Sequence, residues 1–530
     1  MSTFRYHIEF KSGYAVYGKR DDPQGELHIS ELAPEDNAEI DYVSAEMHLN
    51  VEDEEKIFMN GFQTWTYCPE FSTEDKIRGV QGLPKFLVRK FGIDRYGDYY
   101  FREYPNKKGI THGVSWCYFH LGDRYRLIAS LDERPGYTYF TYDANRAVLS
   151  MSRDCSGLKI SGEYSLFDLF FAEGTEDEVF DAWFDAMEIK PRTDKKTAGY
   201  SSWYNRYEDI DEASVRGDLA GCAGVLHPGD LFQIDDGWEE NVGDWLEADT
   251  KKFPCGMKAM ADAVHGQGFE AGLWLAPFVC NTRSAVYREH PDWLLKVDGK
   301  PWNLGCNWGG FWALDIDNPE VTAYLEKVFD KVFNEWGFDL VKLDFLYGAA
   351  PFGTDRETRA GRMYRAMELL RRLCGDKKIL GCGVPVMPAF GIVDYCRVSC
   401  DVGLDWNNSF IMQHTNRERV STKQAIENSV FRRQLNGRAY LSDPDVFFLR
   451  DKNIRLSADE KDTLATACAL FGGVFLSSDD MSEYSDDKKA AYEAYRHLRD
   501  DAKIVSVDAE EGLSVTFMLD GEEHRLVIKE

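Results

Sequence analysis

Two aspartates that each follow a short apolar run are the residues of this chain best suited to acid and base chemistry. Asp344 lies in the segment VKLDF, and Asp401 ends the segment CRVSCD. In a strand, residues i, i+2 and i+4 share a face, so we expect Lys342 to point the same way as Asp344. For the same reason we expect Arg397 to point the same way as Asp401. A cation beside a carboxylate favours its ionised form, so the spacing predicts a catalytic pair of carboxylates on a repeated strand and helix scaffold.

The composition limits the classes of partner. With 530 residues, the chain is long enough for roughly two or three domains, each with its own core. A net charge of −29 argues against nucleic acid or an anionic membrane as a partner, although solubility also explains such a charge. The 13 tryptophans fit either core packing or the stacking of flat rings on apolar sugar faces. A small carbohydrate is therefore a reasonable candidate ligand.

The cysteines and the N-terminal segment bear on the cellular compartment. The N-terminus shows no basic start followed by an apolar run, so no signal peptide is predicted. No segment approaches roughly 18 consecutive apolar residues. The 12 cysteines lack CxxC metal spacing and are typical of reduced, buried thiols. We therefore expect a cytoplasmic protein.

The two ends of the chain have all-β patterns. Residues 1–190 contain short apolar runs such as Trp116–His120 and Tyr125–Ala129, separated by turn signals, and this pattern predicts a β-sandwich. A helix over Glu176–Met187 leads out of it. Residues 487–530 contain one helix and then two short runs joined by an Asp-Gly turn, which is a strong hairpin signal. We expect a small C-terminal β element there.

Residues 191–486 alternate between short apolar segments and helical segments such as Gly256–Gln267. Eight such segments in about 290 residues match a (β/α)8 barrel in count and size, so the predicted fold is multidomain, α/β plus all-β. An open doubly wound sheet is the alternative, but no glycine-rich dinucleotide loop follows the first segment. The eight predicted strands are Gly199–Trp203, Leu231–Asp235, Ala271–Leu275, Leu340–Phe345, Ile379–Gly383, Cys396–Cys400, Ala439–Ser442 and Val474–Ser477.

Polar and aromatic residues follow these predicted strands, where a (β/α)8 barrel carries its catalytic groups. The set is acidic, aromatic and poor in histidine, so it suits sugar hydroxyls and an oxocarbenium-like transition state better than a transition metal. An aspartate at a strand end also commonly caps the next helix. Capping is the better interpretation for Asp443, because Asp and Pro in its DPD turn are turn formers. The candidates are Trp203, Asp235, Asp236, Trp274, Lys342, Asp344, Cys382, Arg397 and Asp401.

Four segments in order, LFQIDDGW, AGLWLAP, VKLDF and RVSCD, resemble glycoside hydrolase family 36, the α-galactosidases and α-N-acetylgalactosaminidases of the melibiase clan. The segment NGFQTW, which ends at Trp65, is similar to the NGxQSW segment of that family. The resemblance covers nearly the whole chain. It implies a β-sandwich before the barrel and a small β domain after it.

The resemblance also implies roles for individual residues. Asp344 matches the nucleophile and Asp401 the general acid/base. Lys342 and Arg397 match basic residues that contact the sugar, and the pair Asp235 and Asp236 matches the residues that hold the O4 and O6 hydroxyls. Trp274 and Trp65 match residues that line the pocket.

One segment departs from the family pattern. GCGVP, which contains Cys382, stands where many members have CxxGGxR, and the strand 3 segment reads GLWLAPF instead of GLWFEPE. Since the former region helps to recognise the sugar at O2, the 2-substituent stays open between hydroxyl and acetamido.

The implied activity is retaining, exo-acting hydrolysis of terminal α-galactosides through a covalent glycosyl-enzyme, without a metal or cofactor. The alternatives are α-N-acetylgalactosaminidase, α-galactosyl transferase and non-catalytic carbohydrate binding. A metal-dependent barrel hydrolase fits poorly, because the HxH pattern after the first strand is missing. The expected partner is a small α-galactoside or oligosaccharide, and the resemblance is compatible with a homo-oligomer.

Overall fold

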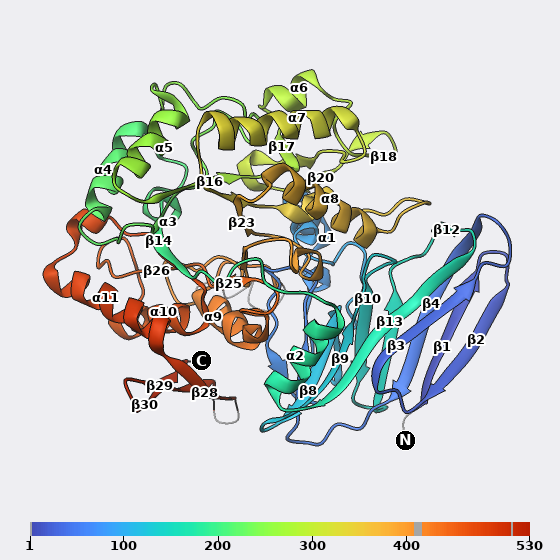
Figure 1. Ribbon diagram of the computed structural model, residues 1–530. Coiled ribbons are helices and arrows are strands. Elements are labelled where there is room, and N and C mark those ends of the chain that lie inside the picture. The colour runs from blue at the N-terminus through green and yellow to red at the C-terminus, as the bar shows by residue number, and fades with distance from the viewer. Residues whose placement is uncertain (1–2, 408–415, 510–511, 530) are drawn as a thin grey trace.

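Two antiparallel sheets occupy the N-terminal part of the computed structural model, which describes residues 3–407, 416–509 and 512–529 (Figure 1). The first sheet has the order β2 (Ala15–Asp21), β1 (Thr3–Phe10), β4 (Ala38–His48), β11 (Val148–Arg153), β10 (Thr138–Asp143), β7 (Ile110–Val114), and β12 (Lys159–Ile160) pairs with β4. The second has the order β3 (Gly25–Leu32), β13 (Glu163–Gly174), β9 (Arg124–Ser130), β8 (Trp116–Leu121), β5 (Lys56–Met59), β6 (Glu70–Phe71).

These two sheets pack face to face over one apolar core. Buried and exposed residues alternate along β1, as expected of a strand with one face in a core. Phe4 of β1 meets Phe167 of β13 edge to face, with ring centroids 6.1 Å apart. The predicted all-β pattern is confirmed as far as Gly174, and the predicted helix follows as α2 (Glu176–Ala186). The short helix α1 (Lys85–Phe91) interrupts the pattern and was not predicted.

A nine-stranded sheet of parallel strands follows. Its order is β25 (Leu441–Asp443), β24 (Tyr395–Arg397), β23 (Lys378–Gly381), β22 (Leu340–Leu343), β16 (Glu270–Leu275), β15 (Leu231–Ile234), β14 (Thr197–Ser201), β27 (Val474–Ser477), β26 (Val446–Phe447). Strands that follow one another in the chain are neighbours, unlike the order of a doubly wound sheet. The two end strands, β25 and β26, are separated only by Pro444 and Asp445, so the sheet curls until its ends meet.

Helices cover this curled sheet on its outer side in Figure 1. Its strands are almost wholly buried, which is typical of parallel sheets with helices packed on them. Neighbouring strands come close at Gly199, where an added Cβ would lie 1.9 Å from the carbonyl oxygen of Leu231. The helices of this part are α3 (Trp203–Arg206), α4 (Glu212–Cys222), α5 (Gly256–Gly266), α6 (Ala285–Glu289), α7 (Pro319–Asp330), α8 (Arg359–Cys374), α9 (Thr422–Phe431), α10 (Ala458–Phe471) and α11 (Asp486–Asp501).

Five of the predicted strands end earlier than expected, and two of these ends matter most for the site. β22 stops at Leu343, so Asp344 follows the strand rather than belonging to it. The next residue, Phe345, has a φ of 53°, a left-handed conformation that is incompatible with a strand. β24 stops at Arg397, so the prediction of a strand that reaches Cys400 is wrong. Both catalytic candidates therefore lie on loops beyond the strands.

Smaller elements lie between β16 and α7 and at the C-terminus. The strands β17 (Val279–Asn281), β21 (Phe311–Ala313) and β20 (Asn303–Gly305) form one sheet, and β18 (Lys296–Val297) pairs with β19 (Lys300–Pro301). The last sheet has the order β28 (Lys503–Asp508), β29 (Ser514–Leu519), β30 (Glu522–Val527). The predicted Asp-Gly hairpin is confirmed between β29 and β30, whereas β28 was not predicted.

One buried arginine ties the N-terminal part to the curled sheet. The guanidinium of Arg432, directly after α9, donates to the carbonyl oxygens of Thr64 at 2.6 Å and Val398 at 2.9 Å. It also donates to the Asn60 side chain at 3.1 Å. Arg432 is 1% exposed, so water cannot replace these bonds. It thereby fixes the NGFQTW segment against the loop that leads to Asp401.

We expect Arg432→Met to lower the free energy of unfolding by about 3 kcal/mol, because it leaves several buried oxygens without a donor. Thermal and urea unfolding followed by tryptophan fluorescence measure the loss. Arg372→Met is the matched control, since Arg372 is an exposed helix residue paired with Glu326, and we expect its change to stay under about 0.5 kcal/mol. Equal stability of the two variants would contradict the role given to Arg432.

Candidate active site

A cavity of about 350 Å³ opens at the carboxyl ends of the curled sheet. Its volume is sufficient for a small ligand. The cavity brings together residues of β16 and β22, residues of α3 and of the loops after β15, β22 and β24, and N-terminal residues. Of the residues predicted from the sequence, those that line it are Trp65, Trp203, Asp235, Asp236, Trp274, Lys342, Asp344 and Asp401. Cys382 and Arg397 lie behind its wall.

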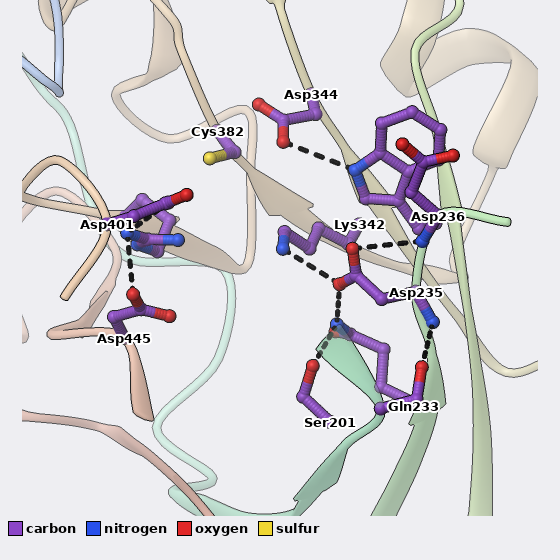
Figure 2. A network of polar contacts seen from close by, with 12 residues as sticks. Ser201, Gln233, Asp235, Asp236, Lys342, Asp344, Cys382, Asp401 and Asp445 are labelled. Atoms are coloured by element: carbon purple, nitrogen blue, oxygen red, sulfur yellow. Dashed lines mark hydrogen bonds and ion pairs between the residues drawn. The ribbon is translucent and has the colours of Figure 1, made fainter. Parts of the chain in front are cut away.

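Asp344 is held rigidly in the cavity floor. Its Oδ1 accepts a hydrogen bond from the backbone N–H of Phe345 at 2.8 Å, and its Oδ2 accepts one from the indole of Trp274 at 3.2 Å (Figure 2). Burial raises the pKa of Asp344, and the charge of Lys342 opposes that shift. The carboxylate is thus oriented by two donors and faces a low-dielectric pocket.

Lys342 has a different ion-pair partner from the one its strand position suggested. Its Nζ lies 2.9 Å from Oδ2 of Asp235 (Figure 2). Asp235 follows β15, which lies two strands away from β22 in the sheet. Burial opposes the ammonium charge, but Asp235 and the other nearby acidic groups together outweigh burial, and the pKa of Lys342 is raised. Gln233 donates to the same Asp235 oxygen at 2.7 Å. Lys342 therefore holds the Asp235 carboxyl group in place while its charge also acts on Asp344.

Asp236 has a separate environment from Asp235. The indole of Trp308 donates to Asp236 Oδ2 at 2.8 Å. Burial raises the pKa of Asp236 well above its usual range, and the nearby buried carboxyl of Glu239 raises it further. Two adjacent aspartates thus differ in their surroundings: Asp235 is paired with a cation, and Asp236 lies beside another acid. Such a pair offers both acceptors and a donor to sugar hydroxyls.

Arg397 turns away from the cavity and bridges two carboxylates. Its Nη2 lies 3.0 Å from Oδ1 of Asp401 and 3.1 Å from Oδ2 of Asp445. The expected proximity of Arg397 and Asp401 is therefore confirmed, although the strand ends between them. The Arg397 side chain is 1% exposed and that of Asp401 is 36% exposed. Asp401 faces the cavity, and Arg397 supports it from below.

Trp65 and Cys382 form one wall together. The Trp65 indole donates to the Cys382 sulfur at 3.3 Å, so Cys382 contacts the tryptophan that lines the cavity. Gly383 has a φ of 56°, and an added Cβ there would lie 2.8 Å from the Trp65 ring. The GCGVP segment is therefore shaped to accept a tryptophan from the N-terminal part of the chain.

Several residues at the cavity were not predicted. Trp308 comes from the excursion between β16 and α7, and Tyr96 from the segment after α1. Glu418 and Arg419 follow the loop that carries Asp401. No strand-end signal marks them, because they lie on irregular segments. Asp445 lies behind the cavity in the DPD segment, where only Asp443 was given a role from the sequence.

Within the described ranges, no group of three or more histidine, cysteine, aspartate or glutamate residues is arranged to hold a metal ion. The acidic residues of the cavity instead pair with Lys342, Arg397 and tryptophan N–H groups. Such an arrangement is chemically suited to hydrogen bonding with hydroxyl groups and to acid and base catalysis.

Residues 192–368 match the Melibiase family model. The α-galactosidase Mel36A of Lactobacillus acidophilus is 32% identical over 154 residues, which are 27% of this chain and 20% of that protein. The "A type blood alpha-D-galactosamine galactosaminidase" of Flavonifractor plautii is 31% identical over 124 residues, which are 22% of this chain and 11% of that protein. The aligned part thus spans a fifth or less of the length of these curated relatives.

Likeness to solved structures extends over the whole chain. The α-galactosidase TtGalA of Thermus thermophilus, in complex with p-nitrophenyl α-D-galactopyranoside, superposes with a TM-score of 0.76 at 26% identity and covers 98% of each chain. Its complex with stachyose gives a TM-score of 0.72 at 27% identity, over 92% of this chain and 98% of that one. Residues 192–368 are thus similar to the Melibiase family, and the chain has the fold of α-galactosidases such as TtGalA.

Proposed function

We propose that this protein is a glycosidase that hydrolyses terminal α-galactosides with retention of configuration. The observation that carries the proposal is the placement of Asp344 and Asp401 in one cavity, each with its own set of partners. The likeness to TtGalA, a structure that contains an aryl α-galactoside, supports the same substrate class.

In the proposed first step, the carboxylate of Asp344 attacks the anomeric carbon and Asp401 gives its proton to the departing oxygen. In the second step, Asp401 takes a proton from water, which releases the sugar from Asp344. Burial makes the Asp344 carboxylate a better nucleophile than a solvated one, while the charge of Lys342 opposes the rise in its pKa. The two N–H donors on Asp344 hold the attacking oxygen in place.

The sugar would be held by the two other aspartates and the tryptophans. Asp235 is fixed by Lys342 as an acceptor for hydroxyl groups. Asp236, with its raised pKa and its Trp308 partner, sits at the same end of the cavity. Trp274, Trp308 and Trp65 provide flat surfaces for the apolar face of a sugar ring.

We also propose that the curled sheet is a complete (β/α)8 barrel, with β25 and β26 together forming its seventh strand. The pairing of β25 with β24 and of β26 with β27 supports this assignment. A β-sandwich over residues 1–190 and a small β domain over residues 487–530 complete the proposed division. In such a barrel the catalytic groups lie at the carboxyl ends of strands.

α-N-Acetylgalactosaminidase activity is the second candidate. The relative from Flavonifractor plautii carries the name of a galactosaminidase, and the GCGVP segment beside Trp65 departs from the usual family pattern. Hydrolysis of para-nitrophenyl α-galactoside and para-nitrophenyl α-N-acetylgalactosaminide, measured side by side, separates the two activities. Product analysis at high sugar concentration detects transfer, and binding without turnover would favour a non-catalytic role.

We expect Asp344→Ala to abolish hydrolysis almost completely, by roughly 10⁴-fold or more, because no other group can form the glycosyl-enzyme. Added azide or formate should restore some turnover of an activated substrate, since a small anion fits the space left by the carboxylate. Initial rates with para-nitrophenyl α-galactoside give the measurement. Substantial residual activity without added anion would exclude Asp344 as the nucleophile.

Asp401→Ala should affect substrates according to their leaving group. Raffinose-type substrates need a proton on the departing oxygen and should lose roughly 10³-fold in kcat/KM, whereas para-nitrophenolate leaves without help and should lose far less in the first step. Comparing kcat/KM for the two substrates tests the role. Equal losses on both would argue that Asp401 is not the general acid.

A further inference from the structure

A buried carboxyl group lies behind the acid/base candidate and outside the cavity. Asp445 occupies the turn between β25 and β26, and its side chain is 5% exposed. The guanidinium of Arg397 separates it from Asp401, with Nη2 3.1 Å from Asp445 and 3.0 Å from Asp401 (Figure 2). Two carboxylates thus compete for one nitrogen of one buried cation.

The hydrogen bonds favour charge on Asp445. Its Oδ2 accepts from the Tyr204 hydroxyl and from the backbone N–H of Val402 at 2.9 Å, in addition to Arg397. Each of its described side-chain hydrogen bonds is one that it accepts, so the ionised form fits its surroundings. Asp401 has one charged donor, Arg397, and a more exposed side chain. Asp445 thus has more hydrogen-bond donors than Asp401, which makes Asp445 the stronger partner for the charge of Arg397.

The backbone of Asp445 is held in an unusual conformation. Its φ is 83°, in the left-handed region that residues other than glycine rarely adopt. The backbone N–H of Asp445 donates to Asp443 Oδ1 at 2.9 Å, which supports this turn. Conformations of this kind persist where the surrounding structure imposes them. The turn aims the Asp445 carboxylate at Arg397 instead of at solvent.

We propose that Asp445 is a positioning residue that binds the charge of Arg397 and so leaves the catalytic proton on Asp401. This inference rests on the proposed glycosidase function. Arg397 alone would draw the proton off Asp401, because a cation within contact distance favours the ionised carboxylate. An ionised Asp445 offsets that cation, and Asp401 then faces a nearly neutral pair.

The electrostatic surroundings agree with a shared proton. Burial raises the pKa of Asp445 to about 7, and Arg397 opposes this shift. Two acids that share one cation titrate as a pair, so one proton is bound by the pair up to near neutral pH. The titratable and charged groups that act on this pair from the surrounding elements include Tyr204, Tyr207, Lys342, Asp344, Cys382, Arg397, Cys400, Asp443 and Cys468.

The test is the pH dependence of kcat/KM in Asp445→Asn. Asparagine tolerates the left-handed backbone and keeps the size of the side chain, so the substitution mainly removes charge. Arg397 then acts on Asp401 alone. We expect the alkaline limb of the profile, which reports the proton on Asp401, to move down by about one pH unit or more. A limb at the wild-type position would overturn the inference.

Asp479→Asn is the matched control. Asp479 is also a buried aspartate at a strand end, with a tyrosine hydroxyl donor at 2.8 Å, two backbone donors and a nearby arginine, but it does not contact Arg397. The alkaline limb of the kcat/KM profile of Asp479→Asn should stay at the pH at which it lies in the wild type. An equal shift in both variants would mean that Asp445 only supports the fold, and it would overturn the proposal.

Two further measurements test the inference if the Asp445→Asn variant does not fold or if the chain shows no turnover. Tyr204→Phe removes one donor from Asp445 and should move the limb in the same direction by a smaller amount. The pH dependence of carbodiimide-mediated amidation of Asp401, followed by peptide mass spectrometry, reports the same proton without catalysis. Absence of turnover in the wild-type chain would contradict the proposed function, whereas an amidation profile unchanged by Asp445→Asn would contradict this inference alone.

Discussion

Two buried cations hold the acidic floor of the cavity in place, and the geometry of the site depends on them. Lys342 is paired with Asp235, and Arg397 is paired with Asp401 and Asp445. Buried carboxylates without such partners would be unstable or would take up protons. Each cation sits on a strand of the curled sheet, so the sheet positions the charges and the charges position the acids. The chemistry is therefore set by the backbone of the sheet even though both catalytic candidates lie beyond strand ends.

The cavity is completed by segments from outside the sheet. Trp65 reaches it from the N-terminal part, where Arg432 fixes the backbone of the same segment. Trp308 comes from the excursion before α7 and binds Asp236. Loops on a rigid scaffold commonly carry binding residues, and here they supply most of the flat surfaces. We propose that residues at the strand ends carry out the reaction and that residues of the segments outside the sheet select the sugar.

Much of the fold was predictable from the pattern of apolar residues. The short buried runs marked all eight positions of the curled sheet, and the Asp-Gly turn marked the last hairpin. The errors lie at strand ends, because a left-handed residue such as Phe345 stops a strand without any signal in hydropathy. Helix α1 and the residues around Tyr96 were missed because the helix has only seven residues and is too short to show a helical period in the sequence.

The sequence by itself determined which residues face the cavity from the strand ends, because strand periodicity and the shared edge of a parallel sheet leave few other arrangements. It did not determine their partners. Lys342 pairs with Asp235 across 107 residues of sequence, and Arg397 reaches Asp445 through the pairing of β24 with β25. Only the tertiary structure decides such contacts, since a buried charge takes whichever opposite charge the packing brings within reach. The same holds for Asp445, whose sequence context indicates a turn and whose position in the fold makes it a partner of the proposed acid/base group.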